Sequence, residues 1–367
     1  MSLPFDEREQ RNMNASDDVI HPPCLTADLP GIGGRIKVEP DDFEVEEIPA
    51  YEPSGVGEFL YLWIEKRDMG AEYFERQIAK RLNLPVSEVG TAGLKDRRAV
   101  TRQWVSVPAN VEPSLAQVDG DGIRVLRVSR HSNKLKAGHL HGNRFRMLIR
   151  VAAPDDAIAR ATPIVERIRT LGLPNYYGTQ RFGRDGETLQ IGLALLRGET
   201  PSKPVRNPFL KKLALSAVQS ALFNHYLAAR FRDGLFRQVL AGDVMCKIPF
   251  GGMFVAADVV AEQQRFEARE TVHAGPITGR KTFAAQGQAL EREQAALERM
   301  GLSVSMFNGF GKMLMGTRRH NLVYPDDLTA APETDGVRVS FRLPAGSYAT
   351  GLLREIMKAD ELLEESE

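Results

Sequence analysis

The residue in this chain best suited to chemistry is Asp96, an acidic side chain set among cations. It follows the small-residue turn 91–94 and is flanked by Lys95, Arg97 and Arg98. Opposite charges within a few ångströms lower the pKa of a carboxyl group, so we expect Asp96 to be anionic at neutral pH and able to attack carbon or bind a cation. The same pattern occurs where a salt bridge caps a strand, and from these residues alone that structural interpretation is the commoner one.

The elements around Asp96 are predicted to be strands. Extended character runs over 89–94, breaks at 95–96 and resumes over 101–107, which places Asp96 at the end of a strand. The clearest strand is 143–151, because apolar and polar side chains alternate along it. One face of this strand is expected to pack in the core, and the other carries three arginines that can meet phosphate: Arg144, Arg146 and Arg150.

The charge of the chain balances overall but is unevenly spread. There are 48 Lys and Arg against 48 Asp and Glu, which excludes a surface that binds nucleic acid everywhere. Between Lys95 and Arg150, twelve cations face four acids, whereas acids gather at 39–47 and 360–367. This asymmetry is typical of a polyanion site confined to one face, although a merely solvated basic face gives the same pattern.

Length and composition bound the class of protein. At 367 residues the chain is long enough for two domains, since single cores rarely grow beyond about 250 to 300 residues. No apolar run approaches the ~20 residues of a membrane span, and the N-terminus lacks the features of a secretory signal, so we expect a cytoplasmic protein. Cys24 and Cys246 are far apart, and His139 and His141 have no third ligand nearby, so neither a disulfide framework nor a metal site is predicted.

The order of elements predicts an α+β fold in which one domain interrupts another. Helices expected over 156–171, 207–234 and 282–300 make a helix-rich middle between two strand-rich flanks. The domain boundaries follow from this outline: an extension over 1–30 that is mobile or loosely docked, a body over 31–171 and 319–367, and an insertion over 172–318.

Several motifs, in a common order, resemble those of the TruD family of tRNA pseudouridine synthases. Residues 93–103 read GLKDRRAVTRQ and meet every fixed position of the family's Gly-x-Lys-Asp-x-x-Ala-Val-Thr-x-Gln signature. Residues 174–183 read PNYYGTQRFG and depart from the family's motif only at Tyr177, where phenylalanine is usual. Further matching blocks lie at 37–43, 142–145, 215–224 and 343–350.

This resemblance implies a fold, a reaction and a partner. The fold is a pseudouridine-synthase catalytic domain, a mixed and mainly antiparallel sheet with flanking helices, interrupted by the family's α/β insertion, the TRUD domain. The reaction is the isomerisation of uridine to pseudouridine in transfer RNA, at position 13, with Asp96 as the catalytic aspartate. Because nothing enters or leaves the substrate, no cofactor or metal is expected, and a monomer is compatible with the sequence.

Matches to the family's motifs also place residues in the uridine site. Phe145 is expected to stack on the flipped uracil, and Phe43 and Phe341 to line the pocket, although single phenylalanines are usually core residues. Asn143 is expected to hydrogen-bond the substrate or orient the aspartate, and Lys37 to pair with an acid or a phosphate near the site. The basic face of the strand at 143–151 and two nearby lysines are expected to follow the tRNA backbone, with an affinity that falls steeply as salt is raised: Lys134, Lys136, Arg144, Arg146 and Arg150.

Other activities stay open at this point. A non-catalytic RNA-binding protein or tRNA folding chaperone could use the same scaffold, but it has no need of an anion next to phosphates, so Asp96 together with Asn143 favours the enzyme. A hydrolase that attacks nucleosides through Asp96 would instead release free uracil. Gln180 and Arg181 fit either a ribose-phosphate contact or a buried hinge between the domains, and we favour the hinge.

Overall fold

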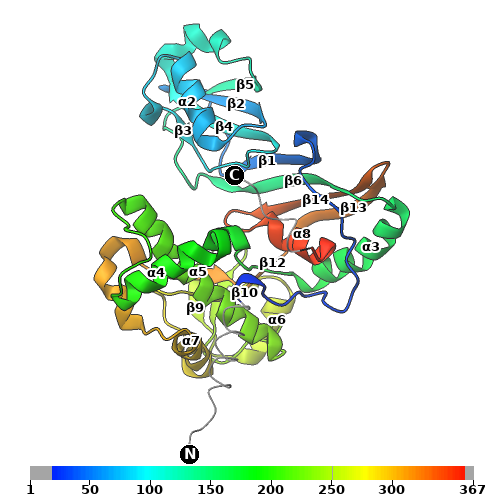
Figure 1. Ribbon diagram of the computed structural model, residues 1–367, viewed down its shortest axis with the longest axis vertical. Helices are drawn as coiled ribbons and strands as arrows, with labels where there is room; N and C mark the ends of the chain where they lie inside the picture. Colours follow the sequence, from blue (N-terminus) through cyan, green and yellow to red (C-terminus); the bar gives the residue numbers. More distant parts are fainter. Residues whose placement is uncertain (1–18, 250, 360–367) are drawn as a thin grey trace, which may run out of the picture.

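The computed structural model describes residues 19–249 and 251–359, which form two domains (Figure 1). The larger sheet has eight strands in the order β13-β14-β6-β1-β4-β2-β5, with β3 paired to β4. β1 and β4 run parallel, and the other neighbouring strands run antiparallel. The strands are β1 (Phe43–Pro49), β2 (Phe59–Arg67), β3 (Gly90–Thr91), β4 (Val100–Pro108), β5 (Ile123–His131), β6 (Leu140–Arg150), β13 (Asp326–Glu333) and β14 (Gly336–Pro344).

Helices cover the two halves of this sheet separately (Figure 1). They are α2 (Ala71–Arg81), α3 (Pro154–Leu171) and α8 (Ala349–Met357). On the half built from β6 and β14, α3 and α8 bury apolar side chains such as Met147 and Val339. On the other half, α2 packs Phe74 and Ile78 against β2 and β4, because these side chains recur on one face of the helix. The helices therefore cover two separate apolar cores on this sheet.

The insertion is a separate α/β domain that the chain enters and leaves side by side. The entering strand β7 (Leu173–Pro174) pairs with the leaving strand β12 (Leu322–Val323). The insertion's sheet has the order β11-β10-β8-β9 and extends to His320, two residues beyond the predicted boundary at 318. Its elements are α4 (Glu187–Arg197), α5 (Pro208–Arg232), β8 (Val244–Lys247), β9 (Met253–Val255), α6 (Val259–Glu267), β10 (Thr271–Ile277), α7 (Gly287–Arg299), the 3-10 segment η6 (Val304–Leu314) and β11 (Thr317–His320).

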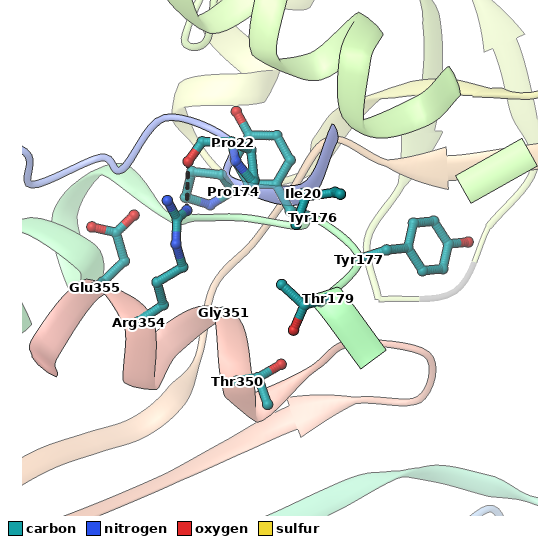
Figure 2. Close-up of a pocket in the computed structure, with 11 residues that line it drawn as sticks. Ile20, Pro22, Pro174, Tyr176, Tyr177, Thr179, Thr350, Gly351, Arg354 and Glu355 are labelled. Atoms are coloured by element: carbon teal, nitrogen blue, oxygen red, sulfur yellow. Dashed lines mark hydrogen bonds between the residues drawn. The ribbon is translucent and has the colours of Figure 1, made fainter. Parts of the chain in front are cut away.

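Residues 19–30 are docked at the junction of the two domains, which differs from the mobile or loosely docked extension that we predicted. The Glu355 carboxylate of α8 accepts hydrogen bonds from the backbone N–H groups of Leu25 at 2.6 Å and Thr26 at 3.0 Å. Asn224 of α5 donates to the carbonyl of Val19 at 2.9 Å. Figure 2 shows Arg354 reaching from α8 to the carbonyl of Pro22, beside a small pocket. The rest of the predicted extension, residues 1–18, lies outside the described residues.

Most predicted elements are present, with shifted ends. The strand predicted at 143–151 is β6, and the helix predicted at 207–234 is α5. The strand predicted at 89–94 is wrong for most of its length, because β3 pairs only two residues with β4 before the chain leaves the sheet. Asp96 consequently lies in an eight-residue loop, 92–99, and not at a strand end. No helix in the described part of the chain is long and apolar enough to span a membrane.

Candidate active site

A polar strip separates the two apolar cores on the helix-covered face of the large sheet. Thr101 of β4 lies opposite Val45 of β1, which belongs to the core under α3 and α8. Val105 lies on the same face of β4, four residues on, and belongs to the core under α2. The residue between them on that face is Gln103, which is buried. The neighbouring strands contribute Glu47 and Asn143, which are register partners.

Three lysines hold the loop 92–99 over this strip. Lys95 is buried and donates to the carboxylate of Glu47 at 2.9 Å, which ties the loop to β1. Lys66 of β2 donates to the backbone carbonyl of Asp96 at 2.8 Å. Lys37 donates to the carboxylate oxygen Oδ1 of Asp96 at 3.0 Å. The loop is therefore fixed on both sides of its functional residue, while the Asp96 side chain stays 36 % exposed.

Lys66 is the most unusual of these groups because its side chain is fully buried. It also donates to the carbonyl of Met69 at 2.6 Å, so both of these hydrogen bonds go to neutral acceptors. Burial lowers the pKa of Lys66 to about 8, with repulsion from Lys95 adding to the effect and attraction by Asp96 and Asp68 opposing it. No pattern in the sequence indicates a role for Lys66, since a lysine in a strand normally points to solvent.

The three predicted phenylalanines gather beside the strip, and Lys37 joins them. Phe145 and Phe341 are register partners whose rings stack with their centroids 5.1 Å apart. Phe43 lies in the same core, and the ammonium of Lys37 is 4.2 Å from the centre of its ring. All three rings are buried, so a uracil could stack on Phe145 only after the ring pair or the loop moves.

Buried polar atoms without a hydrogen-bond partner accumulate at the same place. They are Oγ1 of Thr101, Oε1 of Gln103 and Oδ1 of Asn143. Unpaired buried acceptors are rare in proteins, and each destabilises the fold by about 1 to 3 kcal/mol unless something binds it. We had assigned a role to Asn143 only, although Thr101 and Gln103 stand in the signature motif. The strip therefore has unused capacity to bind hydrogen-bond donors.

The arginines predicted to follow the RNA backbone along β6 are used differently. They lie on the opposite face of the sheet from Phe145 and Asn143, as alternation requires. Arg144 pairs with Glu46 at 2.7 Å, Arg146 with Glu44 at 2.9 Å, and Arg150 with Asp42 at 2.8 Å. The structure thus does not bring Arg144, Arg146 and Arg150 to the aspartate, and their charges are balanced by acids of the neighbouring segment.

Other cations lie closer to the aspartate. The loop 132–139 is hydrogen-bonded to the aspartate loop, because the N–H of Gly138 donates to the carbonyl of Ala92 at 2.8 Å. This loop carries Lys136, which is exposed, and Lys134, which is tied to the carbonyl of Ser87. Arg97 and Arg98 follow Asp96 directly and are both exposed. The sequence motifs indicate no separate role for these two arginines. No group of three or more possible metal ligands occurs within 19–249 and 251–359.

Arg319 connects the two domains, and Arg181 lies on the same aromatic ring, that of Tyr177. Arg319 of β11 donates to the side chain of Asn175 at 2.6 Å and to the carbonyl of Gly346, also at 2.6 Å, so it bridges the insertion and the body. Its guanidinium lies 4.1 Å from the ring of Tyr177. Arg181 donates to two hydroxyls of α5 and also faces Tyr177. Because these Arg181 contacts all lie within the insertion and Gln180 is exposed, the hinge interpretation of these two residues stays a prediction.

The architecture defines the class of protein. The fold, a mixed sheet with two helix-covered halves, is similar to that in the crystal structure of a TruD-type protein from Methanosarcina mazei. The TM-score is 0.75, with 24 % identity over 98 % of this chain and 99 % of that one. This match confirms the predicted α+β fold of the pseudouridine-synthase type.

Sequence comparisons then identify the family. The family model of tRNA pseudouridine synthase D (TruD) matches residues 20–203 and 204–356. A protein from an Anaeromyxobacter species, named tRNA pseudouridine synthase D, is 44 % identical over 94 % of this chain and 98 % of its own length. A Thermus thermophilus protein of the same name is 41 % identical over 93 % of both chains. The chain belongs to the TruD family, as its motifs predicted.

Proposed function

We propose that this protein isomerises uridine to pseudouridine in transfer RNA, at position 13, with Asp96 as the nucleophile. The observation that carries the proposal is the fixed position of Asp96. Its carboxylate is bound by Lys37 at 3.0 Å and is 36 % exposed, while Lys66 and Lys95 hold the loop from beneath. A carboxylate that served only as a salt bridge would not need a loop anchored by three buried or half-buried lysines.

The isomerisation needs one electron pair from the protein, and no atom is transferred between protein and substrate overall. The bond between ribose C1′ and uracil N1 breaks, the base turns, and a bond between C1′ and C5 forms. The proton on C5 leaves and N1 is protonated, so the product is an isomer of the substrate. The carboxylate of Asp96 supplies the pair, either by attack on C1′, by attack on the base, or by removing a sugar proton to give a glycal. Lys37 balances the charge of Asp96 before and after the step.

Recognition of the base uses the polar strip. The uridine must leave its stack before the aspartate can reach it. The unpaired acceptors of Asn143 and Gln103 suit the N3–H of uracil, and the ring pair of Phe145 and Phe341 offers a surface on which the base can stack once it opens. Lys136, Arg97 and Arg98 are placed to meet the flanking phosphates.

The test is a pair of asparagine substitutions. Asp96→Asn is expected to abolish pseudouridine in an unmodified tRNA transcript while tRNA binding stays within about threefold, because the side chain keeps its size and loses its charge. Asp121→Asn is the matched control, since Asp121 is 94 % exposed and pairs with Arg81 away from the loop. Pseudouridine is mapped by carbodiimide block and primer extension, without metal or cofactor, on transcripts with U or C at position 13.

Each other outcome would contradict one part of the proposal or favour another function. Substantial turnover by Asp96→Asn would contradict the nucleophile. A stop that persists in the transcript with C at position 13 would contradict the site. Binding without product in the unsubstituted protein would favour the RNA-binding protein or tRNA folding chaperone, and free uracil on chromatography would favour the hydrolase.

A further inference from the structure

The insertion domain carries a cluster of cations that the candidate active site does not use. Three segments of the domain, 206–212, 279–286 and 304–315, contain no Asp or Glu. Their basic side chains form what we call the insertion-domain basic patch: Arg206, Lys211, Lys212, Arg280, Lys281 and Lys312. Within the described residues none of these side chains makes an ion pair, whereas all three arginines of β6 do. Uncompensated charge on one face is the electrostatic footprint of a polyanion site.

The three segments are neighbours in space, so the patch is a single surface. Lys211, near the start of α5, lies 5.5 Å from the ring of Phe310 in η6. The loop after β10 is hydrogen-bonded to the end of η6, since the N–H of Arg280 donates to the carbonyl of Leu314 at 3.0 Å. In Figure 1 the orange segment that contains η6 lies beside α4 and α5 at the outer side of the insertion.

Apolar side chains stand exposed among these cations. Phe209 is 70 % exposed in the first turn of α5, and Leu210 next to it is 50 % exposed. Phe283 and Val304, on the other two segments, are 39 % and 50 % exposed. Single exposed apolar residues need no explanation, but aromatic rings interleaved with unpaired cations are the arrangement that binds nucleic acid, with phosphates on the cations and bases stacked on the rings. The start of α5 adds backbone N–H groups and carries no acid in its first turn.

A polar stripe leads from the patch towards the domain junction. Lys212, Ser216 and Ser220 are four residues apart on α5 and therefore share one face, over about 12 Å of helix. Ser216 and Ser220 accept hydrogen bonds from Arg181, whose guanidinium has no carboxylate partner within the described residues. Beyond Arg181 lies Arg319, which contacts the body at Gly346. A chain of buried and half-buried polar side chains thus links the patch to the joint with the catalytic domain.

We propose that the insertion-domain basic patch binds a second part of the RNA substrate, a backbone segment remote from the target uridine. The proposal rests on the proposed function, and it explains how the enzyme would distinguish a whole folded tRNA from a short RNA that holds the same uridine. The occupant is RNA because the patch combines unpaired cations with exposed rings. An acidic protein surface would use the cations but leave Phe209 without a role.

The first test measures binding, so it does not depend on turnover. In the Asp96→Asn background, the patch variant Lys212→Gln/Lys281→Gln/Lys312→Gln is compared with the control variant Arg76→Gln/Lys80→Gln/Arg299→Gln, which removes the same charge from exposed sites elsewhere. Fluorescence anisotropy with labelled tRNA is recorded over a series of salt concentrations. The slope of log affinity against log salt is expected to fall by about 2 to 3 in the patch variant and to stay unchanged in the control. Phe209→Ala is expected to weaken binding about tenfold with an unchanged slope.

The second test uses turnover with the natural Asp96. For the patch variant, kcat/KM with whole tRNA is expected to fall at least tenfold, and kcat/KM with a short stem-loop holding the target uridine to fall less than twofold. Equal slopes for the patch and control variants would overturn the proposal, and so would an equal loss on both RNAs. Binding of polyglutamate that depends on the patch while RNA binding does not would assign the surface to an acidic protein instead. If no pseudouridine forms at all, the proposed function fails, and the binding test still decides whether the patch is an RNA surface.

Discussion

The buried ammonium of Lys66 makes the stability of this protein depend on pH in a way that one substitution removes. The pKa of Lys66 is about 8 in the folded protein against 10.5 for an ordinary lysine. Below pH 8 both the folded and the unfolded chain hold the proton, and above 10.5 neither does. Between these values the unfolded chain binds more protons, so the free energy of unfolding rises as pH rises. The sign is opposite to that of a lysine stabilised by an ion pair.

The size of the effect follows from the pKa difference. Each pKa unit corresponds to about 1.4 kcal/mol, and the full difference to about 3 kcal/mol. Over the accessible interval from about pH 7.5 to about pH 9.5, the contribution of Lys66 to the free energy of unfolding rises by about 2 kcal/mol. Lys66→Met cannot titrate, so its free energy of unfolding should lack this rise. The substitution also leaves the carbonyls of Met69 and Asp96 unpaired, a loss that is the same at both pH values.

Urea denaturation at the two pH values measures this directly. The quantity is the change with pH in the difference between the unsubstituted protein and Lys66→Met, because other titrating groups cancel in that difference. Lys80→Met is the matched control, since Lys80 is exposed in the last turn of α2. A pH-dependent difference below about 0.5 kcal/mol for Lys66→Met, or an equal one for Lys80→Met, would refute the reasoning from burial.

Two further predictions concern a buried ion pair of the insertion and the docking of residues 19–30. Asp243→Ala is expected to lower the free energy of unfolding by about 3 to 5 kcal/mol, measured by urea denaturation. The reason is that the fully buried guanidinium of Arg230 donates to both Asp243 oxygens and would lose its counter-charge. A loss of less than half of that amount would contradict the interpretation of Arg230 and Asp243 as a buried ion pair. Glu355→Ala is expected to leave the amides of Leu25 and Thr26 unpaired. Hydrogen exchange and limited proteolysis over residues 19–30 should then accelerate at least tenfold. Unchanged protection would show that apolar contacts alone hold this segment.

The local patterns in the sequence predicted the elements, and the motifs predicted which of them meet. Alternation over 143–151 gave the correct faces of β6, so Phe145 in the core and Arg146 outside were both predictable. The convergence of Phe43, Asn143 and Phe341 could not be derived from alternation, because it depends on the order of strands in the sheet, and only the family resemblance indicated it.

What the sequence could not predict are pairings across strands. Glu44 and Glu46 alternate on β1, and only the register with β6 reveals that they neutralise Arg146 and Arg144. A basic strand face was therefore interpreted as a phosphate-binding face. The burial of Lys66 is equally non-local, since it depends on the loop 92–99 folding back over β2. Charge counts along a chain cannot separate paired from unpaired cations.

The distinction between ion-paired and unpaired cations decides where a protein with no net charge can bind RNA. A phosphate contact gains affinity only if the cation gives up mobile counterions and not an established carboxylate partner, so the ion-paired arginines of β6 have little to offer. Within the described residues, the cations without an ion pair include two groups: Arg97, Arg98 and Lys136 around the aspartate, and the insertion-domain basic patch. Two separate groups of unpaired cations require a substrate large enough to reach both. A folded tRNA meets that requirement, whereas a nucleoside or a short single strand does not, which supports our proposal that the enzyme recognises a second part of its RNA as well as the base it modifies.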